Sequence, residues 1–174
     1  QLMAKRMAGF DMKIIANDPF PNPAAAQRLG VRLVSLDELL TQSDFISLHC
    51  PLTRDNRYLL NGARLRKLKP TAMIINTARG LLIEEKALIA ALAEKRIAGA
   101  ALDVHEVEPV SPDNPLLKMD NVIHTPHTTG HSDTLYDDFW GDSVQTLLEV
   151  VAGRPPKWIV NRPAKPRLAA MAAK

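Results

Sequence analysis

A single arginine stands on a tight turn in the run Asn-Thr-Ala-Arg-Gly, residues 76–80, directly after the short apolar segment 72–75. In an open parallel sheet the carboxyl ends of the strands form the ligand crevice, so Arg79 would face a bound substrate there. An arginine at this place suits a carboxylate, because its planar guanidinium offers paired donors that a lysine cannot reproduce. The alternative from the residues alone is that Arg79 caps a carbonyl or pairs with Glu84 or Glu85.

Two further strand-like segments end in side chains that could carry acid–base chemistry. The segment 98–104 is followed closely by Glu108, and the segment 121–125 is followed by His127. An arginine, a carboxylate and an imidazole at successive strand ends make an anion anchor and a general acid/base with an orienting partner. For His127 taken alone, a packed core histidine would be the better interpretation.

Several motifs in a fixed order carry a resemblance that runs over about residues 1–161. They read ANDPF, HCPLT, INTARG, GAALDVHEVEP, NPLLKMDNVIHTPHTTG and VVAGRPP. In these motifs the chain resembles the D-isomer-specific 2-hydroxyacid dehydrogenases of the phosphoglycerate dehydrogenase and hydroxypyruvate reductase type. The resemblance places the family's catalytic arginine at Arg79, its glutamate at Glu108 before Pro109, and its histidine at His127 after Pro126.

The resemblance also implies a fold and a domain organisation. The fold is α/β, a Rossmann-like parallel sheet with flanking helices, and the printed chain lacks the family's first strand and glycine-rich GxGxxG loop. Residues 1–10 read like the helix that follows that loop, so the loop and the preceding substrate domain are expected outside this sequence. We expect residues 1–131 to form a partial NAD-binding domain, and residues 132–174 to form a long crossover helix and a tail returning toward the substrate domain.

The cofactor site is predicted from position and from the resemblance. Asp18 ends the second strand of a nucleotide-binding half, where a carboxylate accepts hydrogen bonds from the adenosine ribose and repels a 2′-phosphate. The next arginine, Arg28, lies ten positions on, so NAD is expected in preference to NADP. Asp18 could also begin the turn at Pro19, and both roles can hold together. By resemblance, the remaining cofactor contacts are Cys50, Thr77, Ala78, Arg79, Asp103, His127 and Gly130.

The chemistry implied by the resemblance is hydride transfer between the nicotinamide and C2 of a 2-hydroxy or 2-keto acid. His127 would donate a proton during reduction and accept one during oxidation, which suits histidine because both of its forms exist near neutral pH. Glu108 would orient the imidazole and favour its protonated form. Arg79 would bind the substrate carboxylate and polarise the carbonyl. The family's side-chain-recognising residues lie largely in the absent domain, so the identity of the acid stays open.

Strand-like and helix-like segments alternate along the chain, which favours βαβ units and a parallel sheet. Ser35 has the spacing of a capping box with Glu38, and Ser132 is the expected cap of the last helix. Expected strands cover 12–16, 31–34, 45–48, 72–75, 98–104 and 121–125, and expected helices cover 23–29, 61–67, 84–95 and 132–152.

Composition narrows the class of protein. With 46% hydrophobic and 24% charged residues, the chain is expected to be globular with a single core. Cys50 is the only cysteine, so no intrachain disulfide can form. It is interpreted as a small packing residue, and the cytoplasm is the default location.

No apolar run approaches the ~20 residues that cross a bilayer, so no membrane partner is expected. Of the net charge of +3, six positive charges and no negative one lie between residues 153 and 174, a tail more typical of a solvated segment than of a nucleic-acid partner.

Two other classes of protein compete with an NAD-dependent oxidoreductase. The histidines of segment 124–131, with His105 and Glu108 upstream, could indicate a metal hydrolase, but Pro126 and Gly130 interrupt any helix there, so no metal is expected. An NAD(H)-sensing corepressor of the same superfamily would use the domain as a binding scaffold. The expected partners of the oxidoreductase are a small 2-hydroxy or 2-keto acid and a second copy of the chain in a homodimer.

Overall fold

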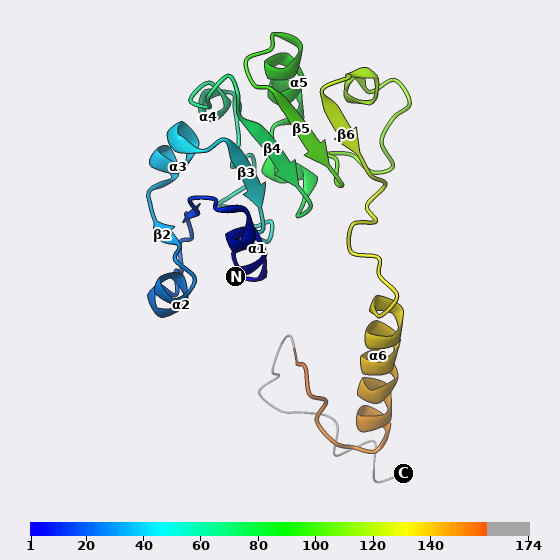
Figure 1. Ribbon diagram of the computed structural model, residues 1–174. Coiled ribbons are helices and arrows are strands. Elements are labelled where there is room, and N and C mark those ends of the chain that lie inside the picture. The colour runs from blue at the N-terminus through cyan, green and yellow to red at the C-terminus, as the bar shows by residue number, and fades with distance from the viewer. Residues whose placement is uncertain (160–174) are drawn as a thin grey trace. The chain divides into compact units, whose positions relative to one another are not determined.

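The computed structural model of the protein describes residues 1–159 (Figure 1). The chain divides into two compact units, the first ending at His127 and the second beginning at Thr128. The basic tail that the sequence predicts falls largely in residues 160–174, outside the described residues.

The strands of the first unit pair in parallel, as the alternating pattern predicts, but they form two sheets instead of one. In the smaller sheet β1 (Ile15–Ala16) pairs with β2 (Arg32–Leu33). The larger sheet has the order β3-β4-β5-β6, so strands that follow one another in the chain are neighbours in space. Because neighbouring strands are parallel, their carboxyl ends meet at one edge. The four strands of the larger sheet are β3 (Phe45–Leu48), β4 (Met73–Asn76), β5 (Gly99–Leu102) and β6 (Val122–His124).

Short helices connect these strands, and several begin at a polar residue that caps the first turn. The side chains of Asn22, Ser35 and Asn61 each accept a hydrogen bond from the backbone N–H three residues on. Such caps satisfy donors that a helix leaves unpaired at its start. The helices of the first unit are α1 (Leu2–Met7), α2 (Pro23–Arg28), α3 (Leu36–Gln42), α4 (Gly62–Leu65) and α5 (Glu85–Ala93), with short 3-10 turns η1 (Ala8–Phe10), η2 (Gly80–Leu82) and η3 (Pro115–Lys118).

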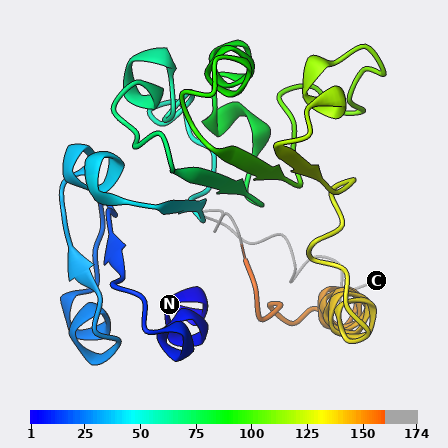
Figure 2. The same ribbon diagram turned by 45° about the horizontal axis from the view of Figure 1, so that its top comes forward.

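The core lies on one face of the four-stranded sheet, under α4, α5 and η3 (Figure 2). Side chains alternate between the two faces of a strand, so Ile46 and Leu48 are buried against the helices. Phe45 points to the other face, where it is 55% exposed, and Ile123 of β6 is 70% exposed. The packed face therefore fixes the strands, and with them the loops at their carboxyl ends.

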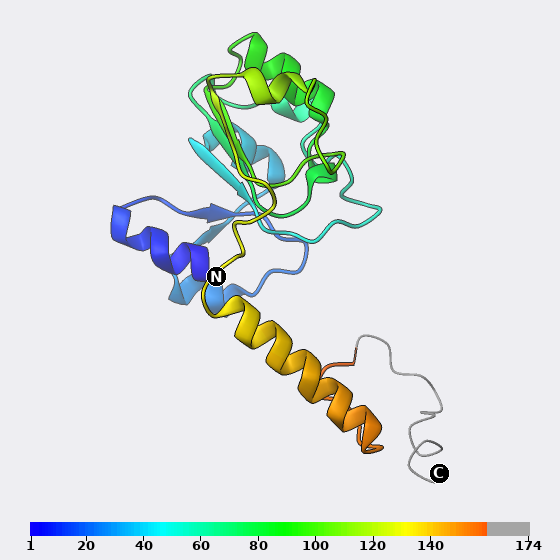
Figure 3. The ribbon, with the colours of Figure 1, turned by 90° about the vertical axis from the view of Figure 1, so that its right-hand side faces the viewer.

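Up to residue 159, the second unit contains one unbroken helix, α6 (Leu135–Val151), seen along its length in Figure 3. The prediction that it begins with a cap at Ser132 is wrong, because Thr134 is the N-cap and its side chain makes no capping hydrogen bond. Ser132 instead contacts the Thr134 hydroxyl at 3.5 Å. Among the described helices, none is long and apolar enough to cross a membrane.

Candidate active site

Asn76, the last residue of β4, stabilises the turn that carries Arg79. Its side chain is buried, with 1% of the residue exposed. Its amide nitrogen donates to the Arg79 carbonyl at 2.9 Å, and its amide oxygen accepts from the N–H of Ala78 at 3.0 Å. The Arg79 guanidinium is exposed, and one of its nitrogens donates to the Ala78 carbonyl at 2.6 Å. Neither Glu84 nor Glu85 forms an ion pair with it, so of the two structural alternatives only the carbonyl contact is present.

Gly80 brings this turn against the loop that follows β5. A Cβ atom at Gly80 would lie 1.8 Å from the carbonyl oxygen of His105, far inside any possible contact. Only glycine leaves room for two backbones at this separation. The loops that carry Arg79 and Glu108 are therefore in direct contact.

Glu108 and His127 form the pair that the sequence predicts. One carboxylate oxygen of Glu108 accepts from the His105 N–H at 2.8 Å, and the other lies 2.9 Å from Nδ1 of His127. The bond from the His105 N–H is the main reason that the pKa of Glu108 lies below its ordinary value, and the contact with His127 adds to it. Because a carboxylate only accepts, this contact places the proton on Nδ1 and leaves Nε2 of a neutral imidazole free to accept one.

The backbone holds His127 in place. Its φ angle of 56° lies in the left-handed region, and its N–H donates to the Asp103 carbonyl at 3.0 Å. Asp103, the residue after β5, is buried, and its carboxylate accepts from the Thr125 hydroxyl at 2.6 Å. The side chains of His127 and Glu108 are 54% and 38% exposed, so the pair is open to a ligand.

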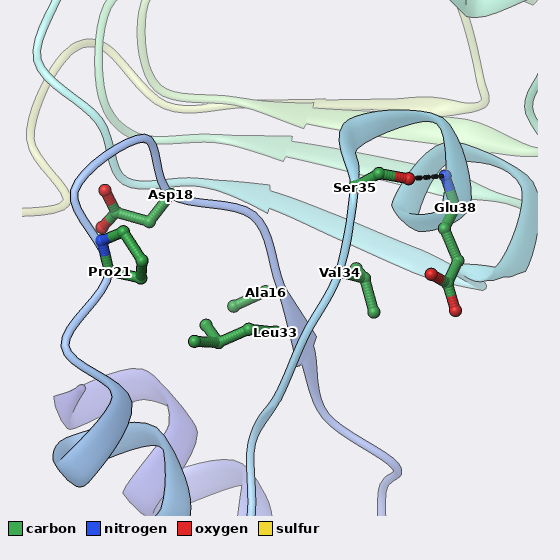
Figure 4. Close-up of a pocket in the computed structure, with 7 residues that line it drawn as sticks. All are labelled: Ala16, Asp18, Pro21, Leu33, Val34, Ser35 and Glu38. Atoms are coloured by element: carbon green, nitrogen blue, oxygen red, sulfur yellow. Dashed lines mark hydrogen bonds between the residues drawn. The ribbon is translucent and has the colours of Figure 1, made fainter.

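The predicted adenosine end of the site is a hollow of about 360 Å³ at the carboxyl ends of β1 and β2. In Figure 4, Asp18 and Pro21 lie on one side of this hollow and Glu38 on the other. One oxygen of Asp18 accepts from the Phe20 N–H at 2.8 Å, so Asp18 does shape the turn. The second oxygen of Asp18 accepts no hydrogen bond within the described part of the chain, so it can accept one from a ribose hydroxyl.

Arg32 is absent from the predicted site residues, although it directly precedes Leu33, which lines this hollow. Its pairing opposite Ile15 in the small sheet is visible only in the structure. The guanidinium is already engaged, since it donates to Glu38 at 2.5 Å and to Gln42 at 3.0 Å. The hollow is therefore lined by Asp18 and Glu38 but by no cation.

The remaining predicted cofactor residues have different settings. Thr77 is exposed and Ala78 half-buried on the turn after β4. Cys50 packs against the core, and burial raises the pKa of its thiol, as expected of a small packing residue. Gly130 belongs to the second unit, so its part in the site remains a prediction.

The histidines give no metal cluster in the part of the chain that the structure describes. His105 and His124 instead stack, with ring centroids 5.4 Å apart, and His124 Nε2 lies 2.8 Å from the Leu116 carbonyl. Nδ1 is buried without a hydrogen-bond partner in both rings. The stacked pair thus connects the loop of Glu108, which carries His105, with β6, which carries His124 and leads to His127.

Comparison with known proteins matches this geometry to one family. Residues 1–129 match the family model for the NAD-binding domain of D-isomer specific 2-hydroxyacid dehydrogenases. A glyoxylate reductase of Korarchaeum cryptofilum is 40% identical over 92% of the chain and 48% of its own length. A D-3-phosphoglycerate dehydrogenase of Archaeoglobus fulgidus is 38% identical over 93% of the chain and 31% of its own length.

A solved structure of a D-lactate dehydrogenase is also similar to this chain. The apo-structure of D-lactate dehydrogenase from Escherichia coli has a TM-score of 0.82 and 37% identity, over 89% of this chain and 48% of that one. The chain thus spans about half the length of these relatives, or less.

Proposed function

Because the chain belongs to the family of D-isomer specific 2-hydroxyacid dehydrogenases, through its NAD-binding domain, we propose that the intact protein interconverts a 2-hydroxy acid and a 2-keto acid. The observation that carries this proposal is the 2.9 Å contact between Glu108 and His127 Nδ1, beside the loop that presents Arg79. An anion anchor and an oriented acid/base at one sheet edge are the parts that this reaction needs.

Each of the three residues has one role in the proposed reaction. Arg79 binds the substrate carboxylate, since its guanidinium is exposed and makes no ion pair in the described residues. His127 transfers a proton between Nε2 and the oxygen on C2, giving it in reduction and taking it in oxidation. Glu108 holds the Nδ1–H and stabilises the imidazolium that forms when Nε2 takes a proton.

The cofactor of this family of domains is NAD, and when bound it supplies or accepts the hydride at C2 of the acid. We assign the ribose of its adenosine half to Asp18, in the hollow beside β1 and β2. Thr77, Ala78, Asp103 and the turn from His127 to Gly130 are assigned to the nicotinamide half, as the resemblance implies.

The names of the relatives support small acids as substrates. One relative is named a glyoxylate reductase and another a D-3-phosphoglycerate dehydrogenase, and the chain covers 48% and 31% of them. Either class of acid therefore suits this proposal. We further propose that the protein works as a homodimer in the cytoplasm.

The test is the substitution Arg79→Lys in the intact protein, which keeps the charge but loses the paired donors. We expect kcat/KM with glyoxylate or hydroxypyruvate to fall roughly a hundredfold, as for the loss of one charge-stabilising donor in an active site. The dissociation constant for NADH, measured by fluorescence, should change much less.

Arg96→Lys is the matched control, because Arg96 lies on the surface in an ion pair with Glu94. This variant should keep wild-type kinetics. Near-normal turnover by Arg79→Lys would remove Arg79 from the reaction and leave it as a residue that bonds the Ala78 carbonyl.

A further inference from the structure

The position of Glu108 depends on a peptide that lies outside the three proposed catalytic residues. The His105 N–H donates to one oxygen of Glu108 at 2.8 Å, and this bond turns the other oxygen toward His127. The side chain of Glu108 is 38% exposed, so packing alone does not hold it. Whatever fixes the backbone at residues 105 and 106 therefore fixes the orientation of Glu108.

Glu106 fixes that backbone through a reciprocal pair of hydrogen bonds with Glu85, at the start of α5. The Glu106 N–H donates to a carboxylate oxygen of Glu85 at 3.2 Å, and the Glu85 N–H donates to a carboxylate oxygen of Glu106 at 3.2 Å. The other oxygen of Glu85 accepts from the Asn114 amide at 2.8 Å. Both carboxylates are thereby occupied by donors rather than left facing each other.

Tyr58 connects the Glu106 carboxylate to the turn that carries Arg79. Its hydroxyl donates to the second oxygen of Glu106, and this bond is the main reason that the pKa of Tyr58 lies above its ordinary value. Its backbone N–H donates to the Leu81 carbonyl at 2.8 Å, one residue beyond Gly80. Glu106 thus receives donors from α5 and from the loop that is fastened to the Arg79 turn.

We propose that Glu106 is a positioning residue: by binding Tyr58 and Glu85 it fixes the His105 peptide that orients Glu108 toward His127. The inference rests on the proposed function, since it concerns the acid/base pair of that reaction. Glu106 itself does not contact His127, so it acts only through Glu108.

The role requires a side chain that can hydrogen-bond to both Tyr58 and the Glu85 N–H. Alanine removes both bonds, whereas glutamine keeps one acceptor for the Glu85 N–H and can turn its NH₂ toward the Tyr58 oxygen. Glu106→Gln should therefore retain most of the arrangement that Glu106→Ala loses. Tyr58→Phe removes only the hydroxyl bond and should have an intermediate effect.

The tautomer of neutral His127 reports the orientation of Glu108 without any turnover. A carboxylate at Nδ1 selects the Nδ1–H form, whereas an imidazole without this partner favours the Nε2–H form. The experiment records ¹⁵N chemical shifts of the histidine rings in the full chain, at a pH where they are neutral. Wild type should show mainly Nδ1–H for His127, and Glu108→Ala, which removes the acceptor, should weaken that preference.

The expected result is that Glu106→Ala moves His127 toward the Nε2–H form by at least half of the change caused by Glu108→Ala. Glu106→Gln should restore most of the wild-type signal, and Glu106→Ala should add little in the Glu108→Ala background, because both act through one contact. Glu94→Ala, at an exposed glutamate of the same chain, is the control and should leave the signal unchanged.

Two other outcomes separate this inference from the proposed function. If Glu108→Ala moves the His127 signal and the Glu106 variants and Tyr58→Phe do not, Glu106 is not a positioning residue and the acid/base pair stands. If Glu108→Ala itself has no effect, the pair does not form, and both ideas are overturned. Should Glu106→Ala fail to fold, Tyr58→Phe and Glu106→Gln carry the same comparison.

Discussion

At the scale of single residues, charged side chains in this site are held by backbone groups and by each other before any ligand is present. Glu108 lies between the His105 N–H and His127, and Arg32 lies between Glu38 and Gln42. The second case bears on the cofactor. A 2′-phosphate near Asp18 would meet a carboxylate, and it would have to draw Arg32 away from its partners to find a cation.

We therefore expect the intact protein to use NAD(H) in preference to NADP(H), and we expect Asp18→Asn to weaken that preference. Hydrogen bonds to a charged group contribute about 1.5–3 kcal/mol, so kcat/KM for NAD should fall roughly tenfold or more. The value for NADP should fall less or rise, because the repulsion is gone. The measurement is kcat/KM with both cofactors for both proteins, and a wild-type preference for NADPH would place Asp18 outside the ribose site.

The residues at strand ends could be predicted because a tight turn after an apolar strand has a local signal, as at Arg79. The partners of those residues could not. Tyr58 and Glu106 are 48 positions apart, and Glu85 lies 21 positions from Glu106, so nothing local in the sequence indicates that the three side chains meet. Such pairs arise from the tertiary packing of separate loops on one sheet edge.

At the scale of elements, the order of strands and helices follows the predicted alternation, and β3 has its predicted bounds, whereas several other elements are shorter. The segment 98–104 is a strand only over Gly99–Leu102, because Asp103 and Val104 already turn toward the loop of Glu108. The segment 84–95 is a helix over Glu85–Ala93, with Glu84 as its N-cap. A strand ends at the residue where its pairing with the neighbouring strand stops, and a single sequence does not show where that happens.

Two glycines show how strongly the setting decides the effect of one methyl group. At Gly80, a Cβ would meet the His105 carbonyl, so Gly80→Ala should destabilise the protein by about 1–3 kcal/mol or more. At Gly141, inside α6, the added Cβ would meet no atom within 4 Å apart from its chain neighbours and the backbone of its own helix. Gly141→Ala should therefore stabilise the helix by about 0.5–1 kcal/mol, because alanine loses less backbone entropy.

Urea unfolding of both variants beside wild type measures the two effects. Gly80→Ala should also lower turnover, since the loops of Arg79 and Glu108 would have to separate. An unchanged free energy of unfolding for Gly80→Ala would mean that these loops are not in the contact described above.

At the scale of the whole molecule, the stability of the fold should depend on pH through groups that lie at the site. The His105 side chain is only 7% exposed, and burial lowers its pKa below the ordinary value of 6.5, with Glu85 partly offsetting this effect. Burial also lowers the pKa of His49. The unfolded chain then binds protons more readily than the folded protein, so stability is complete above about pH 6.5 and declines as the pH falls below it. Glu108 acts in the same direction below pH 4.5, because its pKa is lowered as well.

His105→Phe separates these two windows, because phenylalanine keeps a ring beside His124 but cannot take up a proton. In wild type, the urea midpoint should fall as the pH is lowered from 7 to 5. In His105→Phe that fall should be smaller, while the loss of stability below pH 4.5 should persist. Glu108→Gln should show the reverse, with the upper window retained and the lower one reduced. A wild-type midpoint that stays constant between pH 7 and 5 would mean that His105 is protonated as easily in the folded protein as in the unfolded chain, and that its ring is not buried against His124.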